Sequence, residues 1–269
     1  MKICSIFALY FDNMNNHEKR SEEQRVGERF DRVFPQEEAG GNLGGEKFRE
    51  ISNILRRSSE GIEDTKRIIE RQLVVLENHV LKEGSFDIVK VWNEYESIKG
   101  KGIVRLEPGT EADVFLLNNN GKRKVIKIVK WNTFSFRKRN RTPLEFLINK
   151  VMIHNAIFPG TCYKLIGYCH RFDEFCFVLE QAYIPPFFDD SNKVIGSTIK
   201  EIEDDMIEKR GFRKEGKSIV RYESDDYIVS DLHLGNVLKG ADGELYYIDP
   251  SVRLNEINRS YKNILNHKP

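Results

Sequence analysis

The chain has 269 residues, of which 39% are hydrophobic and 32% are charged. This length allows one or two domains with an ample core, and the composition is typical of a soluble globular protein with a charge-rich surface. The formal net charge of +1 excludes a global electrostatic footprint for nucleic acid or an anionic membrane, so any such binding would have to be local.

The cysteine spacing argues against a zinc site. The chain has four cysteines, Cys4, Cys162, Cys169 and Cys176, and no two of them are as close in sequence as zinc ligands usually are. We therefore expect buried structural thiols and a reducing, cytoplasmic location. The N-terminal run MKICSIFALYF is short for a secretory signal and has no small-residue cleavage pattern after it. No stretch approaches the roughly 18 apolar residues of a membrane-spanning helix, so we predict no membrane segment.

The first part of the chain predicts little order. Residues 13–60 are polar, charged and glycine-containing, and EEAGGNLGGEK is their loosest part. We interpret residues 1–60 as a flexible or weakly helical leader.

The pattern changes after this leader. Apolar residues recur at near-helical spacing over residues 62–83, and a shorter helix is predicted over residues 87–98. We expect residues 61–100 to form a helical extension that packs on the following domain. A partner-binding role is the alternative for this extension.

Residues 101–182 carry the pattern of an antiparallel sheet. Two apolar runs, ADVFLL and KVIKIVKW, flank Asn120-Gly121, which is typical of a two-residue hairpin turn. Thr142 and Pro143 then mark the start of a helix over residues 143–158. Two further apolar runs, CYKLIGYCH and EFCFVLEQAYI, complete a predicted five-stranded unit.

Before that helix, residues 130–141 (KWNTFSFRKRNR) interleave aromatic and basic side chains. Such a pattern suits a local nucleic-acid or phosphosubstrate patch. We favour a solvated loop, with nucleic acid as a remote alternative partner.

The densest polar cluster lies in residues 227–250, YIVSDLHLGNVLKGADGELYYIDP. A strand, YIVS, leads into a turn that holds Asp231, His233 and Asn236. A hairpin around Asp242-Gly243 follows this turn.

The two arms of this hairpin carry candidate metal ligands. Arms in register bring the start of the first near the end of the second, so Asn236 and Asp249 should be neighbours. An amide oxygen beside a carboxylate suits Mg²⁺, which commonly binds one or two protein oxygens together with substrate phosphates. Asp231 is then placed to orient or deprotonate a hydroxyl, as in kinase phosphoryl transfer.

The run DLHLGN (231–236), followed by YID (247–249), resembles the catalytic and metal-binding motifs of the protein-kinase-like fold. Its Asp-x-His-x-x-Asn form is the one that aminoglycoside and choline kinases carry. The order of further pieces, from PLEFLINKVMIHNAIFP (143–159) through Met206 to Gly211-Phe212, resembles the serine/threonine/tyrosine kinase-like domain found in polyvalent proteins of bacterial mobile elements.

This resemblance implies an α+β, bilobal protein-kinase-like fold. We expect residues 101–269 to form the domain, with a five-stranded antiparallel N-lobe (101–180), a hinge (180–186) and a minimal C-lobe (187–269). No Ala-Pro-Glu motif follows Asp249, so the region that docks peptides in ordinary protein kinases is missing.

The resemblance also implies ATP and Mg²⁺ as cofactors. Asp231 would position the acceptor hydroxyl, and Asn236 and Asp249 would bind the metal. His233 is expected to orient the loop through hydrogen bonds, with action as an acid or base as the alternative.

The phosphate-binding residues follow from the same resemblance. Lys127 matches the strand lysine that pairs with the α- and β-phosphates, although Lys124 and Lys130 compete with it. Glu145 would be the ion-pair partner of Lys127; the alternative is a simple helix-start charge. Gly109 stands in the place of the Gly-rich phosphate loop, with one glycine where the full motif has three.

The adenine contacts would come from the hinge, through the backbone of Glu180 and Ala182. We therefore predict an ATP- and Mg²⁺-dependent kinase that transfers the γ-phosphate to a protein hydroxyl. A small-molecule phosphotransferase is one alternative, opposed by the lack of a large helical substrate-binding region. A catalytically weak nucleotide-binding or interaction module is another, favoured by the degenerate Gly loop and the short C-lobe. The sequence leaves the acceptor and the oligomeric state open.

Overall fold

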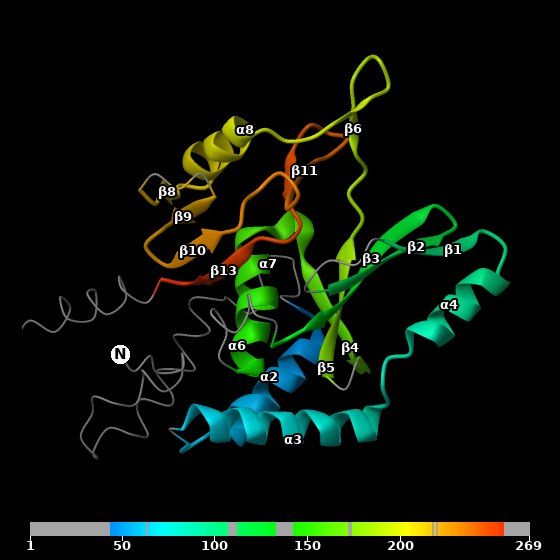
Figure 1. Ribbon diagram of the computed structural model, residues 1–269, viewed down its shortest axis with the longest axis vertical. Helices are drawn as coiled ribbons and strands as arrows, with labels where there is room; N and C mark the ends of the chain where they lie inside the picture. The colour runs from blue at the N-terminus through cyan, green and yellow to red at the C-terminus, as the bar shows by residue number, and fades with distance from the viewer. Residues whose placement is uncertain are drawn as a thin grey trace, which may run out of the picture.

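The computed structural model describes residues 44–62, 64–106, 112–132, 142–171, 174–216, 218 and 220–255. Its largest sheet has five antiparallel strands in the order β1-β2-β3-β5-β4 (Figure 1). The strands are β1 (Lys101–Arg105), β2 (Ala112–Asn119), β3 (Lys122–Lys130), β4 (Tyr163–Arg171) and β5 (Glu174–Ala182). The predicted mixed fold with a five-stranded antiparallel sheet is therefore confirmed.

The β2–β3 hairpin sets the direction of one candidate site residue. Its turn residues, Asn120 and Gly121, have φ angles of 50° and 85°, the left-handed values that this two-residue turn requires. Val114 pairs with Lys127 across the hairpin. Because side chains alternate along a strand, Lys127 projects from the face opposite to Ile126.

The two faces of the sheet contact different apolar clusters. Ile126 lies in the cluster that is packed against helix α4 (Ile88–Ser97). Val129 and Leu179 lie on the other face, in the main core. Lys127, two residues before Val129, therefore points from β3 into the main core.

Helix α2 (Glu46–Ser58) belongs to this main core. Its Phe48, Ile51 and Leu55 are buried there, and their spacing places them in one stripe. Helix α2 lies within residues 1–60, for which we predicted a flexible or weakly helical leader, and the stripe gives this helix apolar surface to pack. Residues 1–43 of that leader lie outside the described residues.

The helix predicted over residues 62–83 is observed as α3 (Thr65–Glu83). The Asp64 side chain caps it by accepting the backbone N–H of Arg67 at 2.9 Å. Gly84 ends it with a φ angle of 87°, which is costly for other residues. In the described part of the chain, no helix combines the length and the apolar character needed to cross a membrane.

A further helical segment packs between β4 and β13 (Figure 1). It consists of α6 (Pro143–Leu147), the π-helical η2 (Ile148–Ile153) and α7 (His154–Ile157). It confirms the helix predicted after Thr142. Buried Gln72 of α3 accepts the backbone N–H of Leu144 at 3.1 Å, so α3 holds the first turn of this segment. Its π-helical centre is unusual, since π-helical turns are rare and occur frequently at functional sites.

The C-terminal residues form a four-stranded sheet in the order β13-β10-β9-β8 and a separate hairpin, β11–β12. The strands are β8 (Arg213–Lys214), β9 (Arg221–Glu223), β10 (Tyr227–Ser230), β11 (Val237–Lys239), β12 (Leu245–Tyr247) and β13 (Ser251–Leu254). The other elements are η3 (Pro159–Thr161), β6 (Phe187–Phe188), β7 (Val194–Ile195), α8 (Ile199–Asp204) and η4 (Asp205–Lys209). As predicted, the β11–β12 hairpin turns at Asp242-Gly243, where Gly243 has a φ angle of 83°.

A buried polar network fixes β12 against η4. Tyr247 Oη donates to Asp205 Oδ2 at 2.6 Å, and Arg210 Nε donates to the same oxygen at 2.7 Å. The Arg210 guanidinium also lies 4.8 Å from the centroid of the Tyr247 ring, which stacks on Phe158. A buried carboxylate that is paired in this way holds its partners firmly, because leaving it unpaired would be costly. The network thereby anchors the strand that leads to Asp249.

Candidate active site

Asp231 follows β10 directly and has a φ angle of 66°. A positive φ is uncommon for a residue other than glycine and indicates a conformation that its surroundings impose. Asn236 Nδ2 donates to the Asp231 carbonyl oxygen at 2.9 Å, and the Asn236 backbone N–H donates to the His233 carbonyl oxygen at 2.9 Å. These hydrogen bonds within the loop hold its backbone, and thereby the position of Asp231.

His233 lies within this loop. Its Nδ1 accepts the backbone N–H of Gly235 at 3.1 Å, and its Nε2 lies 3.8 Å from Asp231 Oδ1. The hydrogen bond from Gly235 makes the imidazole ring part of the hydrogen-bond network that holds the loop. This geometry favours the interpretation that His233 orients the loop over the interpretation that it acts as an acid or base.

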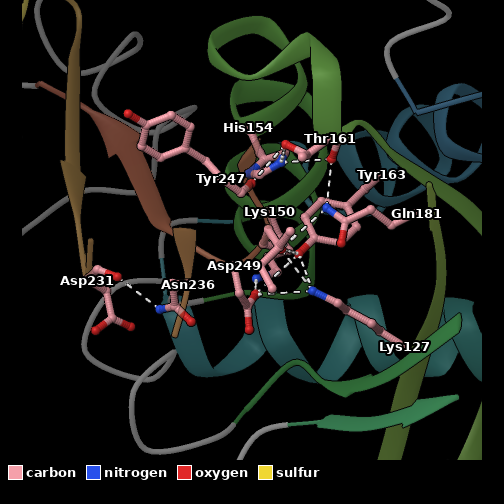
Figure 2. A network of polar contacts seen from close by, with 11 residues as sticks. Lys127, Lys150, His154, Thr161, Tyr163, Gln181, Asp231, Asn236, Tyr247 and Asp249 are labelled. Carbon is pink, nitrogen blue, oxygen red and sulfur yellow. Dashed lines mark hydrogen bonds and ion pairs between the residues drawn. The ribbon is translucent and has the colours of Figure 1, made fainter. Parts of the chain in front are cut away.

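The hairpin brings Asn236 and Asp249 together. Val237 pairs with Tyr247, and the Ile248 backbone N–H donates to the Asn236 carbonyl oxygen at 2.9 Å. Figure 2 shows the Asn236 side chain between those of Asp231 and Asp249. The three polar residues that the sequence predicted to lie together therefore do so.

Lys127 approaches this group from the five-stranded sheet. Its Nζ donates to Tyr163 Oη and to the Ile248 carbonyl oxygen, both at 2.9 Å, and lies 3.9 Å from Asp249 Oδ1 (Figure 2). The competing lysine, Lys124, pairs with Glu180 at 2.9 Å instead. Of these two lysines, Lys127 is the one at the site.

The sequence did not reveal a second lysine, Lys150 of η2. Its Nζ contacts Asp249 Oδ1 directly (Figure 2). The side chains of Lys127 and Lys150 are each only 7% exposed, whereas that of Asp249 is 38% exposed. The carboxylate therefore lies at the open end of a buried pair of ammonium groups.

The charged side chains of this group shift one another's pKa values. Burial lowers the pKa of Lys127 to about 8, against the opposing effect of Asp249, and Lys150 lowers it further. Burial alone would raise the pKa of Asp249, but the ammonium groups of Lys127 and Lys150 outweigh it and hold that pKa below its usual range. Asp249 is therefore a carboxylate at neutral pH, as a metal ligand must be.

Glu145 does not occupy the predicted place. Its carboxylate accepts the backbone N–H of Thr142 at 3.1 Å, while its own backbone N–H donates to Thr142 Oγ1 at 3.2 Å. This is a capping box, which satisfies the exposed N–H groups at the start of α6. Among the described residues Lys127 forms no ion pair with Glu145, so the geometry favours the helix-start alternative.

The two hinge residues lie in β5. Glu180 pairs with Ile126 on one side and with Lys164 on the other. Ala182 pairs with Lys124 of β3 but lies beyond the last paired residues of β4 and β5. Of the two, only Ala182 therefore has an open strand edge beside it. The remaining predicted residue, Gly109, lies outside the described residues.

A buried network behind the site holds Tyr163 and the chain around Ile248. Asn155 exchanges two hydrogen bonds of 2.7 Å with the backbone of Tyr163. Gln181 Nε2 donates to the carbonyl oxygens of Thr161, at 2.7 Å, and Ile248, at 3.3 Å. These roles were not predicted, since they depend on contacts between separate elements, such as that of Gln181 with Ile248, 67 positions away.

His154 belongs to the same network and is fully buried. Its Nε2 lies 3.0 Å from the Thr161 carbonyl oxygen. Burial lowers the pKa of His154 to about 3, and Lys150 contributes in the same direction. The imidazole is therefore neutral in the folded protein at neutral pH.

This shift predicts acid instability. Between pH 6.5 and 3 the unfolded chain binds a proton at His154 that the folded chain does not, so the free energy of unfolding should fall as the pH drops. From pH 6.5 to pH 4 the loss should be about 3 kcal/mol. Urea unfolding at several pH values checks this: His154→Gln should flatten the acid slope, whereas His170→Gln, at a partly exposed position of β4, should retain it. Equal slopes in all three proteins would contradict the prediction.

The donor set fits a magnesium ion that is shared with a phosphate ligand. Asn236 offers an amide oxygen and Asp249 a carboxylate, both hard ligands. Among the described residues, no three His, Cys, Asp or Glu side chains gather into a site that could hold a metal by themselves. A cation at this place would therefore complete its coordination with water and with oxygens of a substrate, as Mg²⁺ does in phosphoryl-transfer sites.

The arrangement as a whole joins a carboxylate on a strained loop, an oxygen donor pair and buried ammonium groups. A sequence model of one protein family, described as the serine/threonine/tyrosine kinase found in polyvalent proteins, matches residues 74–256. This range covers more than half of the chain and includes every described residue of the site. No curated protein matches the chain.

Proposed function

Because the chain belongs to the family of serine/threonine/tyrosine kinases found in polyvalent proteins, we propose that it is an ATP- and Mg²⁺-dependent phosphotransferase. It transfers the γ-phosphate to the hydroxyl group of a protein side chain. The observation that carries the proposal is the convergence of Asp231, Asn236, Asp249 and Lys127 from separate elements on one place (Figure 2).

Each residue has a distinct task in this reaction. Asp231, fixed by its loop, accepts a hydrogen bond from the acceptor hydroxyl and takes its proton as the phosphoryl group transfers. Asn236 and Asp249 would hold Mg²⁺, which supplies neutralisation of the phosphate charge. Lys127, placed by β3 and held by Tyr163, donates to phosphate oxygens. Catalysis comes mainly from positioning and from preorganised charge.

The arrangement of elements supports a two-lobed kinase domain. The sheet β1–β5 with α6–α7 would be the N-lobe, β5 would continue into the hinge at Ala182, and residues 187–255 would form a minimal C-lobe. Helices α3 and α4 would be an extension that packs on the N-lobe. We place the protein in the cytoplasm because its thiols are free in the described residues.

The form of the proposed C-lobe supports a protein acceptor. Within residues 187–255 the described helical structure is the short segment α8–η4, and the rest is strands and turns. These described residues include no large helical region that could enclose a small substrate. A protein hydroxyl that approaches from solvent, towards the partly exposed Asp231 side chain, fits this open site better.

Replacing Lys127 with methionine tests the phosphate contact. Charge-assisted hydrogen bonds are worth about 1.5–3 kcal/mol, so Lys127→Met should weaken ATP binding in the presence of Mg²⁺ about tenfold or more. Isothermal titration calorimetry measures this affinity. The matched control is Lys124→Met, on the same strand but paired with Glu180, and it should bind as the wild type does. Equal affinities for the two variants would contradict the assignment.

A further inference from the structure

Among the described residues, Lys150 is a charged residue of the site that the proposed reaction does not yet use. It lies in the π-helical η2, and its Nζ contacts Asp249 Oδ1. It also lies 5.1 Å from the centroid of the Tyr163 ring, the same distance as Lys127. Two elements, β3 and η2, thus bring two ammonium groups to the same carboxylate and the same ring (Figure 2).

Such a pair is costly to bury. Like charges repel strongly where water is excluded, and each ammonium group also loses its hydration. A single lysine would suffice to pair with Asp249. The second lysine therefore adds an energetic cost, and a ligand with negatively charged oxygens could relieve it by binding between the two ammonium groups.

The position of Lys150 also conflicts with the proposed metal. Its Nζ lies on Asp249 Oδ1, one of the oxygens through which Asp249 would ligate Mg²⁺. An ammonium group and a divalent cation that meet at this oxygen repel each other. Metal binding therefore weakens the contact between Lys150 and Asp249 and favours another partner for the ammonium group.

We propose that Lys150 is a second phosphate-binding lysine, which exchanges its contact with Asp249 for a contact with the phosphates of a bound nucleotide. Its Nζ contacts Asp249 in the structure; when the metal nucleotide binds, it donates instead to the phosphate oxygens beside Lys127. A lysine suits this exchange because its ammonium group is compact and its three donors rotate freely. The inference rests on the proposed function and adds to it a residue that couples metal binding to nucleotide binding.

The exchange predicts two opposite effects of Lys150→Met. Without nucleotide, the variant should bind Mn²⁺, a probe for the magnesium site, several-fold more tightly, because Asp249 is no longer held by Lys150. With metal present, the same variant should bind ATP about tenfold more weakly, because a charge-assisted contact to phosphate is lost. Electron paramagnetic resonance of free Mn²⁺ and calorimetry of ATP measure the two affinities.

Matched variants localise the effect. Lys164→Met, at an exposed position of β4, should behave as the wild type does in both measurements. The double variant Lys150→Met/Asp249→Asn should lose the gain in Mn²⁺ affinity, because that gain depends on the Asp249 carboxylate. Lys150→Gln, which keeps a polar end, replaces Lys150→Met if the methionine variant fails to fold.

The outcomes separate this inference from the proposed function. Tighter Mn²⁺ binding together with weaker ATP binding supports the exchange. If the wild type binds ATP with Mg²⁺ and Lys150→Met matches it in both measurements, the exchange is wrong and the proposed function stands. Weaker binding of both ligands would mean that Lys150 only supports the fold, which also overturns the exchange. A wild type that binds no nucleotide would overturn both.

Discussion

Asp231→Asn is expected to reduce phosphate transfer by a factor of about 10²–10⁴ while leaving ATP affinity unchanged, because general-base catalysis contributes on that scale. The two effects should separate because the Asp231 side chain lies next to His233, away from the lysines. Asparagine is the right substitution, since it tolerates the left-handed backbone at this position.

Two measurements on the same sample test this separation. Transfer of label from γ-labelled ATP reports the reaction, and calorimetry reports nucleotide affinity. The control is Asp204→Asn, at a partly exposed position of α8 that pairs with Lys200, and it should retain full transfer. A parallel loss of ATP binding in Asp231→Asn, or unchanged transfer, would contradict the role that we assign to Asp231.

Asp249→Asn should make ATP binding insensitive to Mg²⁺ and abolish transfer. The amide cannot supply the negative charge that attracts the cation. Among the ion pairs of the described residues, Asp249 is the sole carboxylate that pairs with Lys127 and Lys150. Free ATP should still bind, since both lysines remain available for its phosphates.

A thermal-shift titration of ATP with and without Mg²⁺ measures this change directly. The wild type should show a larger shift with Mg²⁺, and Asp249→Asn should show equal shifts. The control is Asp242→Asn in the turn of the same hairpin, where the side chain bonds Tyr246 and Glu244. If Asp249→Asn kept its dependence on Mg²⁺, the metal would have to bind elsewhere.

The parts of the fold that were predictable have local causes. The turns at Asn120-Gly121 and at Gly243 require positive φ angles, and the hairpins follow from that local requirement. Helix α2 was predicted only as part of a flexible or weakly helical leader, because charged residues surround its three buried side chains. The signal was present, since Phe48, Ile51 and Leu55 lie at helical spacing, but the polar composition outweighed it.

The same distinction holds for the candidate site. Asp231, Asn236 and Asp249 lie within one short stretch, so a hairpin argument alone brought them together. The contact between Lys150 and Asp249 spans 99 positions and could not be inferred locally.

Two local signals in the helix could have improved the prediction. Lys150 lies among the buried residues of its helix, three residues after Leu147. A buried lysine is rare unless an oppositely charged or polar group pairs with it. The sequence Thr-Pro-Leu-Glu also matches a capping box, which accounts for Glu145 without Lys127.

The most direct test of the account is labelled-phosphate transfer by the wild-type protein. The protein is incubated with γ-labelled ATP and a generic protein acceptor, with and without Mg²⁺, and labelled side chains are identified by mass spectrometry. We predict label on serine, threonine or tyrosine hydroxyls of the chain or the acceptor, only when Mg²⁺ is present, and none with Asp231→Asn. ATP binding without any transfer of label to protein would contradict the proposed kinase.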